Sequence, residues 1–138
     1  MMNQVIEMQQ ELVDELSFFD DWDDKYDYVI SLGKMLPPFP DSSKTPNNLV
    51  KGCQSQVWFD SSVSDGTLHF VATSDALIVS GLIGMLLRVY NNATPKDILE
   101  STPEFIAEMG FGGNLSATRA SGLSAMVSYI YNTAINNI

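Results

Sequence analysis

The sequence predicts an α+β domain in which helices pack around a small antiparallel sheet of two or three strands. Apolar residues recur every three or four positions towards both ends of the 138-residue chain, which is the helical period. Between residues 54 and 73 the pattern changes to segments rich in Val, Phe, Trp and Thr, which favour strands. Helices that flank one block of strands indicate the α+β class. No repeat or linker divides the chain, so residues 1–138 are expected to form one domain.

Two helices are predicted in the first 34 residues. The first covers Val5–Phe19 and the second covers Trp22–Lys34. The apolar stripe of the first helix consists of Val5, Met8, Leu12, Leu16 and Phe19. Gly33 lies near the end of the second helix, where a left-handed residue is favoured. The proline-rich segment 36–40 then stops any helix and favours an extended path into a polar loop.

A hairpin is predicted in the middle of the chain. Its strands are expected over Gln54–Phe59 and Thr67–Thr73, and Ser64-Asp65-Gly66 between them is a turn signal. Leu49–Lys51 is a candidate for a third short strand.

The helical pattern returns after the hairpin. Ser74 or Asp75 is suited to cap a helix that is apolar on nearly all sides, which predicts the buried centre of the domain. Ser116 is expected to cap the last helix.

Two short helices are predicted between these long ones. Thr94-Pro95 and Thr102-Pro103 each combine a capping residue with proline at the first helical position. The second of these helices is expected to end at Gly110, and residues 112–114 are expected to form a loop.

The charge of the chain argues against nucleic acid and anionic membranes as partners. The chain has 7 basic and 17 acidic residues, a net charge of −10, whereas phosphate binding needs clustered Lys and Arg. Nine acidic residues fall within the first 28 positions. They predict either a solvated surface that favours solubility or an acidic face for a basic partner.

No targeting or membrane-spanning segment is predicted. The N-terminus lacks a basic region followed by an apolar stretch, so no signal peptide is expected. The longest uncharged apolar run, residues 76–87, has 12 residues, and a bilayer needs about 20. A cytoplasmic protein is therefore expected, in which a lone thiol stays reduced.

Cys53 is the only cysteine, so neither an intramolecular disulfide nor a cysteine-rich metal site can form. It follows a polar loop and precedes a predicted strand, and Gly52 gives the backbone freedom there. Such a junction can present a thiol to another protein, and Lys51 could favour the thiolate. The alternative is a buried, inert cysteine that packs as a small apolar residue, although the polar neighbours of Cys53 favour a functional thiol.

Enzyme motifs are otherwise absent: there is no Walker A loop, dinucleotide-binding glycine pattern or nucleophile elbow. The single histidine, His69, lies on the second predicted strand. A hydrolytic pair with Cys53 would require hydrogen-bond reach between them, and a partly exposed structural histidine is the favoured alternative.

The segment Gly52-Cys53-Gln54-Ser55-Gln56-Val57-Trp58 resembles the signature of the SufE family, the sulfur-acceptor partners of cysteine desulfurases. The resemblance extends along most of the chain. Further matches are Trp22, Lys25-Tyr26, Leu32-Gly33, Leu36-Pro37, Ser74-Asp75-Ala76, Gly81-Leu82-Ile83, Thr94-Pro95, Arg119 and Gly122-Leu123. Asn114 departs from the pattern, because many relatives have histidine there.

The resemblance implies a fold shared with the scaffold proteins of cluster assembly (the SufE/IscU-like fold). It also implies that Cys53 takes persulfide sulfur from a desulfurase of the SufS or CsdA kind, stimulates that enzyme, and delivers the sulfur to an acceptor such as a SufBCD-type scaffold. Pyridoxal phosphate would belong to the desulfurase, so no cofactor or metal of this chain is expected. The protein would then be a sulfur-transfer accessory without independent turnover.

The same resemblance implies roles for the residues around Cys53. The loop that carries Gln54, Ser55 and Gln56 would rest against the body and swing out at the partner, with Gly52 as its hinge. Two further residues match family positions near this loop.

Arg119 would hold the loop or stabilise the sulfur anion, with an ordinary surface ion pair as the alternative. Asp75 matches a family acid near the loop and is also a candidate helix cap.

Two other functions stay open. The protein could be an activator that docks to the desulfurase without holding sulfur, or its thiol could be a reversible redox sensor.

Overall fold

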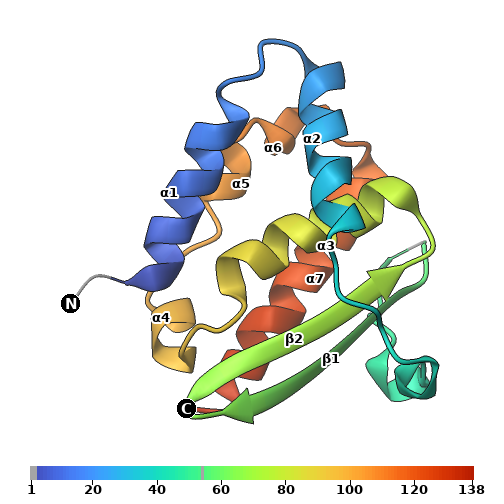
Figure 1. The fold of residues 1–138 in the computed structure, drawn as a ribbon, viewed down its shortest axis with the longest axis vertical. Helices are drawn as coiled ribbons and strands as arrows, with labels where there is room; N and C mark the ends of the chain where they lie inside the picture. The colour runs from blue at the N-terminus through green and yellow to red at the C-terminus, as the bar shows by residue number, and fades with distance from the viewer. Residues whose placement is uncertain (1–2, 54) are drawn as a thin grey trace.

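The computed structural model describes residues 3–53 and 55–138, and the side chains of all of these except residues 112 and 114. It confirms the α+β class, with helices packed against a two-stranded antiparallel sheet (Figure 1). In chain order the elements are α1 (Gln4–Leu16), α2 (Trp22–Lys34), the 3-10 helices η1 (Asp41–Ser43) and η2 (Pro46–Asn48), β1 (Val57–Ser64), β2 (Thr67–Ser74), α3 (Leu77–Tyr90), α4 (Pro95–Leu99), α5 (Phe105–Glu108), α6 (Phe111–Asn114) and α7 (Ala117–Ile135).

The first two helices begin at capping side chains. Asn3 accepts hydrogen bonds from the N–H groups of Val5 and Ile6, which starts α1. This helix ends at Leu16, short of the predicted end at Phe19. The prediction was wrong there because the chain turns after Leu16, and the Phe19 ring packs beside a tyrosine of α2 with ring centroids 5.3 Å apart.

Three glycines allow α2 and α3 to cross at backbone contact. Gly33 lies inside α2, and it does not end the helix in a left-handed conformation as predicted. A Cβ on Gly33, Gly81 or Gly84 would lie 2.6 Å from backbone atoms of the opposite helix. Only a residue without a side chain fits at such a crossing.

The sheet is a hairpin, as predicted, but its first strand starts later than expected. β1 and β2 pair from Val57↔Ser74 to Ser64↔Thr67, and the turn residues Asp65 and Gly66 both have positive φ angles. Of the predicted strand start, Gln54 lies outside the described residues. The candidate third strand is reduced to one bridge between Leu49 and Trp58.

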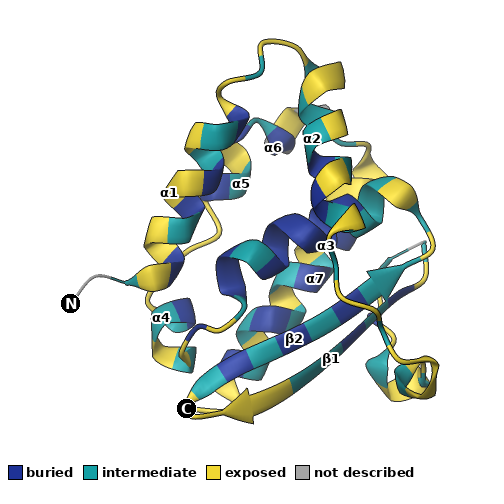
Figure 2. Cartoon of the chain, in the orientation of Figure 1, coloured by how far each residue is buried: buried dark blue, intermediate teal, exposed yellow. Residues whose placement is uncertain are grey.

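Helix α3 forms the centre of the molecule, as its apolar sequence predicts. Residues 81–87 are all buried (Figure 2). The helix packs against α1, α2, α7 and β2. It therefore connects the N-terminal helices to the sheet, and it carries one wall of the site described below.

The segment between α4 and α7 departs from the prediction. Thr94 caps α4 through a hydrogen bond from the Asp97 N–H, but Thr102 does not cap α5, which begins only at Phe105. Gly110 adopts a left-handed conformation after α5. The predicted loop after it is one helical turn, α6, because the buried Phe111 ring packs against Trp22 of α2, with ring centroids 5.4 Å apart.

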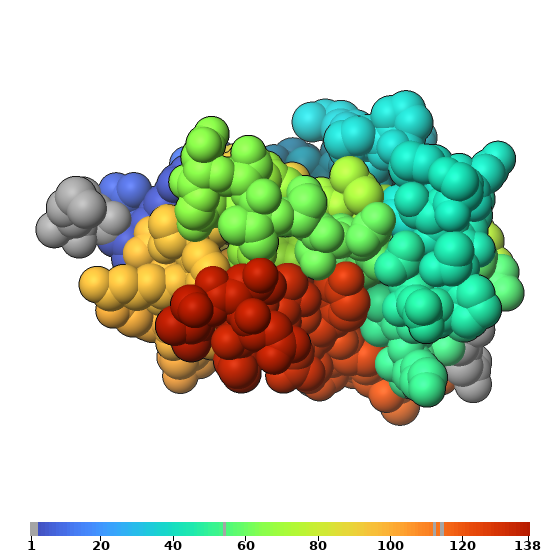
Figure 3. Space-filling view, turned by 90° about the horizontal axis from the view of Figure 1, so that it is seen from below, coloured from blue at the N-terminus to red at the C-terminus, as the bar shows by residue number. Residues whose placement is uncertain are grey.

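The hairpin lies beside α7 on the face shown in Figure 3, where the green strands border the red C-terminal helix. Phe59 of β1 and Tyr129 of α7 join the two elements, with ring centroids 5.0 Å apart. Among the described residues, no helix combines the length and the apolar character needed to cross a bilayer.

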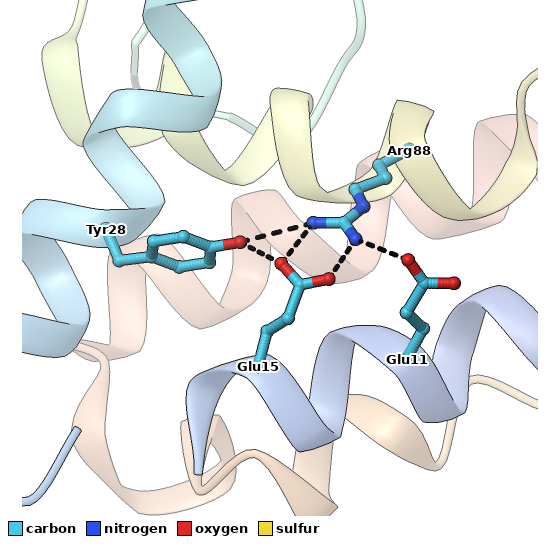
Figure 4. A network of polar contacts seen from close by, with 4 residues as sticks. All are labelled: Glu11, Glu15, Tyr28 and Arg88. Atoms are coloured by element: carbon cyan, nitrogen blue, oxygen red, sulfur yellow. Dashed lines mark hydrogen bonds and ion pairs between the residues drawn. The ribbon is translucent and has the colours of Figure 1, made fainter. Parts of the chain in front are cut away.

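A polar network fixes α1 and α2 to α3 (Figure 4). The Arg88 guanidinium of α3 donates to both carboxylate oxygens of Glu15, to Glu11 at 3.0 Å and to the Tyr28 hydroxyl at 3.2 Å. Tyr28 in turn donates to Glu15. The hydrogen bonds from Arg88 hold the pKa of the Glu15 carboxyl below its ordinary value.

We expect Arg88→Met to lower the free energy of unfolding by about 2 kcal/mol at pH 7, since it leaves a partly buried carboxylate without its cation. The pKa of Glu15 is lowered by folding, so its contribution is full above the unfolded-state pKa of about 4.3 and disappears as the pH falls below it. The difference in the free energy of unfolding between wild type and Arg88→Met should therefore become smaller below about pH 4.

Urea unfolding of wild type and Arg88→Met at a series of pH values measures this loss of stability. The control is Lys96→Met, which removes an exposed 3.9 Å ion pair to Glu100 and should cost less than about 0.5 kcal/mol. The prediction would be contradicted if Arg88→Met and Lys96→Met lowered the free energy of unfolding by the same amount.

Candidate functional site

Cys53 lies at the tip of a loop that is closed at its base. The Val50 N–H donates to the Val57 carbonyl oxygen at 2.8 Å, and Leu49 bridges to Trp58. These contacts tie the two ends of segment 51–56 together beside the start of β1. Gly52, immediately before the cysteine, has a φ of +94°, a conformation that other residues adopt only with strain. The base is therefore fixed, and the tip contains a residue of high backbone freedom.

The Cys53 side chain rests on the N-terminal half of α7. Its Sγ lies 3.7 Å from the Gly122 carbonyl oxygen, to which the thiol donates a hydrogen bond. A Cβ on Gly122 would lie 3.5 Å from this sulfur, and a Cβ on Gly52 would lie 3.4 Å from Cβ of Ala125. Small residues on both sides thus let the loop lie close against the helix.

A cavity of about 390 Å³ opens beside the sulfur. Its walls come from the loop, from the start of α3 and from the first turns of α7. The lining residues are Cys53, Ser55, Ala76, Ile78, Val79, Leu82, Ser116, Thr118, Arg119, Gly122, Leu123 and Met126. The volume of the cavity leaves room for additional atoms on the sulfur. Most of the lining residues are apolar or small, so its wall is mainly apolar.

The electrostatics of the site combine a disfavoured thiolate with a nearby cation. Burial raises the pKa of the Cys53 thiol. Lys51, which the sequence suggested as a residue that could favour the thiolate, is exposed in this structure. Arg119 lines the same cavity from the first turn of α7, at the positive end of a 19-residue helix.

Arg119 is exposed, and its backbone N–H is hydrogen bonded to the capping Ser116 hydroxyl at 3.2 Å. The surface ion pair considered as an alternative role is not found among the described residues. Arg119 therefore shares the cavity with Cys53, and its role towards the loop or the sulfur stays a prediction.

The other predicted site residues divide into two groups. Ser55 lines the cavity, whereas Gln56 is exposed and is not among its described lining residues; Gln54 lies outside the described residues. Asp75 is exposed and does not line the cavity either.

Asp75 also does not cap α3, contrary to the prediction. Ala76 holds the capping position without a side-chain hydrogen bond, and the Ser74 hydroxyl accepts from the Ala76 N–H at 3.2 Å. The turn before α3 is thus closed by Ser74, one step ahead of the helix, and the carboxylate of Asp75 is left at the surface.

His69 does not form a pair with Cys53. It is paired with Ser62 in the sheet, and its ring nitrogen contacts the Thr67 hydroxyl at 3.0 Å. At about 3.3 Å per residue it lies about 16 Å along β2 from Ser74, the strand end nearest Cys53. His69 is therefore a structural residue of the sheet, which is the alternative that the sequence favoured.

Some acidic residues near the N-terminus have internal roles. Glu11 and Glu15 bind Arg88, and Asp21 caps α2 by accepting from the Asp24 N–H at 2.9 Å. Asp20 of the α1–α2 turn and Asp23, Asp24 and Asp27 of α2 are exposed. An acidic docking face there stays a prediction, with a smaller set of free charges than the sequence suggested.

Sequence reasoning missed the contribution of Gly122 to the site. It lies in the interior of α7, where glycine costs about 1 kcal/mol relative to alanine. An isolated glycine inside a helical pattern is a signal of a close approach, and here the approaching group is the Cys53 thiol.

Comparisons with known proteins identify the family and agree with the fold. Residues 10–134 match the family model SufE, described as an Fe–S metabolism associated domain. The chain is 38% identical over 125 residues to an uncharacterised SufE-like protein of Rhizobium etli, covering 87% of this chain and 84% of that protein. It is 36% identical over 129 residues to another from Rhizobium meliloti, with 90% and 92% covered.

Among solved structures, the solution structure of a hypothetical protein from Thermus thermophilus superimposes with a TM-score of 0.78 at 17% identity. The match covers 94% of this chain and 95% of that one. At this level of identity the match shows a shared fold and nothing about activity.

Proposed function

Because the chain belongs to the SufE family and so takes part in Fe–S sulfur metabolism, we propose that Cys53 accepts persulfide sulfur from a cysteine desulfurase and delivers it for iron–sulfur cluster assembly. In this role the protein also stimulates the desulfurase. It is a carrier, and the pyridoxal phosphate that releases sulfur from cysteine belongs to its partner. The final acceptor would be a cluster scaffold of the SufBCD type.

The placement of the only thiol in the chain supports this proposal above all. Cys53 is half-buried at a cavity, on a loop closed at its base, with Arg119 on the same cavity. A carrier needs a thiol that can reach a partner and then return to shelter. A loop fixed at its base and pivoting at Gly52 can perform that movement without unfolding the domain.

The transfer step is a thiol–disulfide type of exchange. The Cys53 thiolate attacks the terminal sulfur of the persulfide on the desulfurase. A new S–S bond forms to Sγ of Cys53 as the S–S bond to the donor cysteine breaks, and the donor leaves as a thiolate. No net oxidation occurs, so the step needs no external oxidant or reductant.

The lack of a second cysteine favours storage of the sulfur. A nearby thiol would attack the persulfide, form a disulfide and release sulfide. With one cysteine in the chain, the sulfur stays bound until a thiol of the next protein collects it. The cavity offers the terminal sulfur an apolar wall, and the Arg119 guanidinium offers its negative charge a partner.

Intact mass spectrometry tests the proposal. The protein is incubated with a cysteine desulfurase and cysteine, and its mass is measured without reductant. We expect a gain of one sulfur atom on the wild-type chain, removed by later treatment with a thiol reductant. A mass that stays unchanged while the desulfurase turns over would contradict the carrier role.

A further inference from the structure

We propose that Gly122 is a positioning residue, which keeps the Cys53 thiol protonated and its loop tucked against α7 until a partner draws the loop out. This inference rests on the proposed carrier function and concerns how the empty carrier is held. Two features of Gly122 carry it, namely its carbonyl oxygen and its missing side chain. Both act on the same sulfur atom.

The carbonyl oxygen selects the protonated form of Cys53. A thiol has one proton, and the structure places the Gly122 oxygen 3.7 Å from Sγ as its acceptor. A thiolate has no proton to donate, so its negative charge would face the negative end of the carbonyl dipole. When the proton leaves to water, the attraction between loop and helix is replaced by repulsion.

The missing side chain makes this contact geometrically available. A Cβ at position 122 would already be in van der Waals contact with Sγ and would lie 3.9 Å from the Cys53 Cβ. The γ atoms of a larger residue would enter the space that the sulfur occupies. The loop can therefore rest in its observed position only above a very small residue.

A charged side chain lines the pocket, and it opposes the selection of the protonated thiol only weakly. Among the described residues that line the cavity, Arg119 of α7 is the charged one, and the residues contributed by α3 are apolar. Arg119 is exposed, which places its charge in water-screened surroundings. Burial adds to the effect of the carbonyl, because it raises the pKa of the thiol.

Loading with sulfur removes the same contact. In a persulfide the bond from Sγ to its proton is replaced by a bond from Sγ to the second sulfur, so Sγ has nothing to donate to Gly122. The hydrogen bond thus distinguishes the empty carrier from the loaded one. The empty thiol is held as a poor nucleophile, which limits its alkylation and oxidation until the desulfurase engages the loop.

Two measurements on the isolated protein test this inference. The first is the rate of Cys53 alkylation by iodoacetamide across pH in Gly122→Val. We expect about a tenfold faster reaction at pH 7 and a titration midpoint about one pH unit lower than in wild type, since one pKa unit is a factor of ten in thiolate. The control is Gly113→Val, because a Cβ at Gly113 meets no atom within 4 Å, and it should react as wild type does.

The second measurement is the hydrogen-exchange protection of segment 51–56. Wild type should lose protection as pH rises through the thiol titration, whereas Cys53→Ser should not, because its hydroxyl does not ionise in this range. A Gly122→Val alkylation profile equal to wild type, or the same loss of protection in Cys53→Ser, would overturn the inference. Neither experiment contains a desulfurase, so a negative result here leaves the carrier function intact.

Discussion

Gly84→Val is expected to lower the free energy of unfolding by about 4 kcal/mol or more, a large share of the stability of a domain of this size. The Cβ that this change adds would lie 2.6 Å from the backbone carbonyl group of Leu32. Backbone atoms cannot move aside as the end of a flexible side chain can. The crossing of α2 and α3 would have to open, and the buried side chains of α3 would lose their contacts with α2.

Urea unfolding followed by circular dichroism measures the effect. Gly113→Val makes the same chemical change at a helical glycine with open space around its Cβ position. It should stay within about 0.5 kcal/mol of wild type, as surface substitutions usually do. Similar unfolding midpoints for the two variants would show that the α2–α3 crossing is not as tight as described.

The glycines show where sequence reasoning reaches its limit. Gly33 was interpreted as a helix end, because near the end of a helical pattern glycine usually marks a left-handed residue. Glycine is needed at position 33 because α2 crosses α3 there at backbone contact with a glycine some fifty positions later. No local sequence pattern contains that partner. By contrast, the prediction of a turn at Asp65-Gly66 is confirmed. The residues that favour this turn are the same residues that form it, so the local sequence is sufficient.

The same distinction applies to the site. The polar neighbours of Cys53 only favoured a functional thiol over an inert one, and the family resemblance supplied its role. The family resemblance implied an arginine near the loop, and Arg119 lines the same cavity as Cys53. The resemblance likewise implied that Asp75 is near the loop; its side chain is exposed and is not among the described residues that line the cavity. Gly122 was not assigned a role, since only the tertiary packing of the loop on α7 reveals it.

Cys53→Ser is expected to abolish sulfur acceptance, with no persulfide detectable by intact mass after incubation with a desulfurase and cysteine. The hydroxyl of serine cannot form the S–S bond that holds the transferred sulfur, and this chain has no other thiol that could do so. The fold should be preserved, because the serine hydroxyl is smaller than the thiol and fits in the same space. A control is Ser62→Ala, an exposed position on β1 opposite His69, which should accept sulfur as wild type does.

The same variant separates the carrier from its two alternatives when desulfurase turnover is measured beside the mass. A carrier loses both the mass gain and the stimulation of the desulfurase with Cys53→Ser, because the enzyme persulfide is no longer removed. A docking activator would keep full stimulation without the cysteine. A redox sensor would be modified by peroxide in the wild type and would gain no sulfur from the desulfurase at all. We expect the first of these three results, because the chain belongs to the SufE family and its only thiol lies at a cavity with room for a second sulfur.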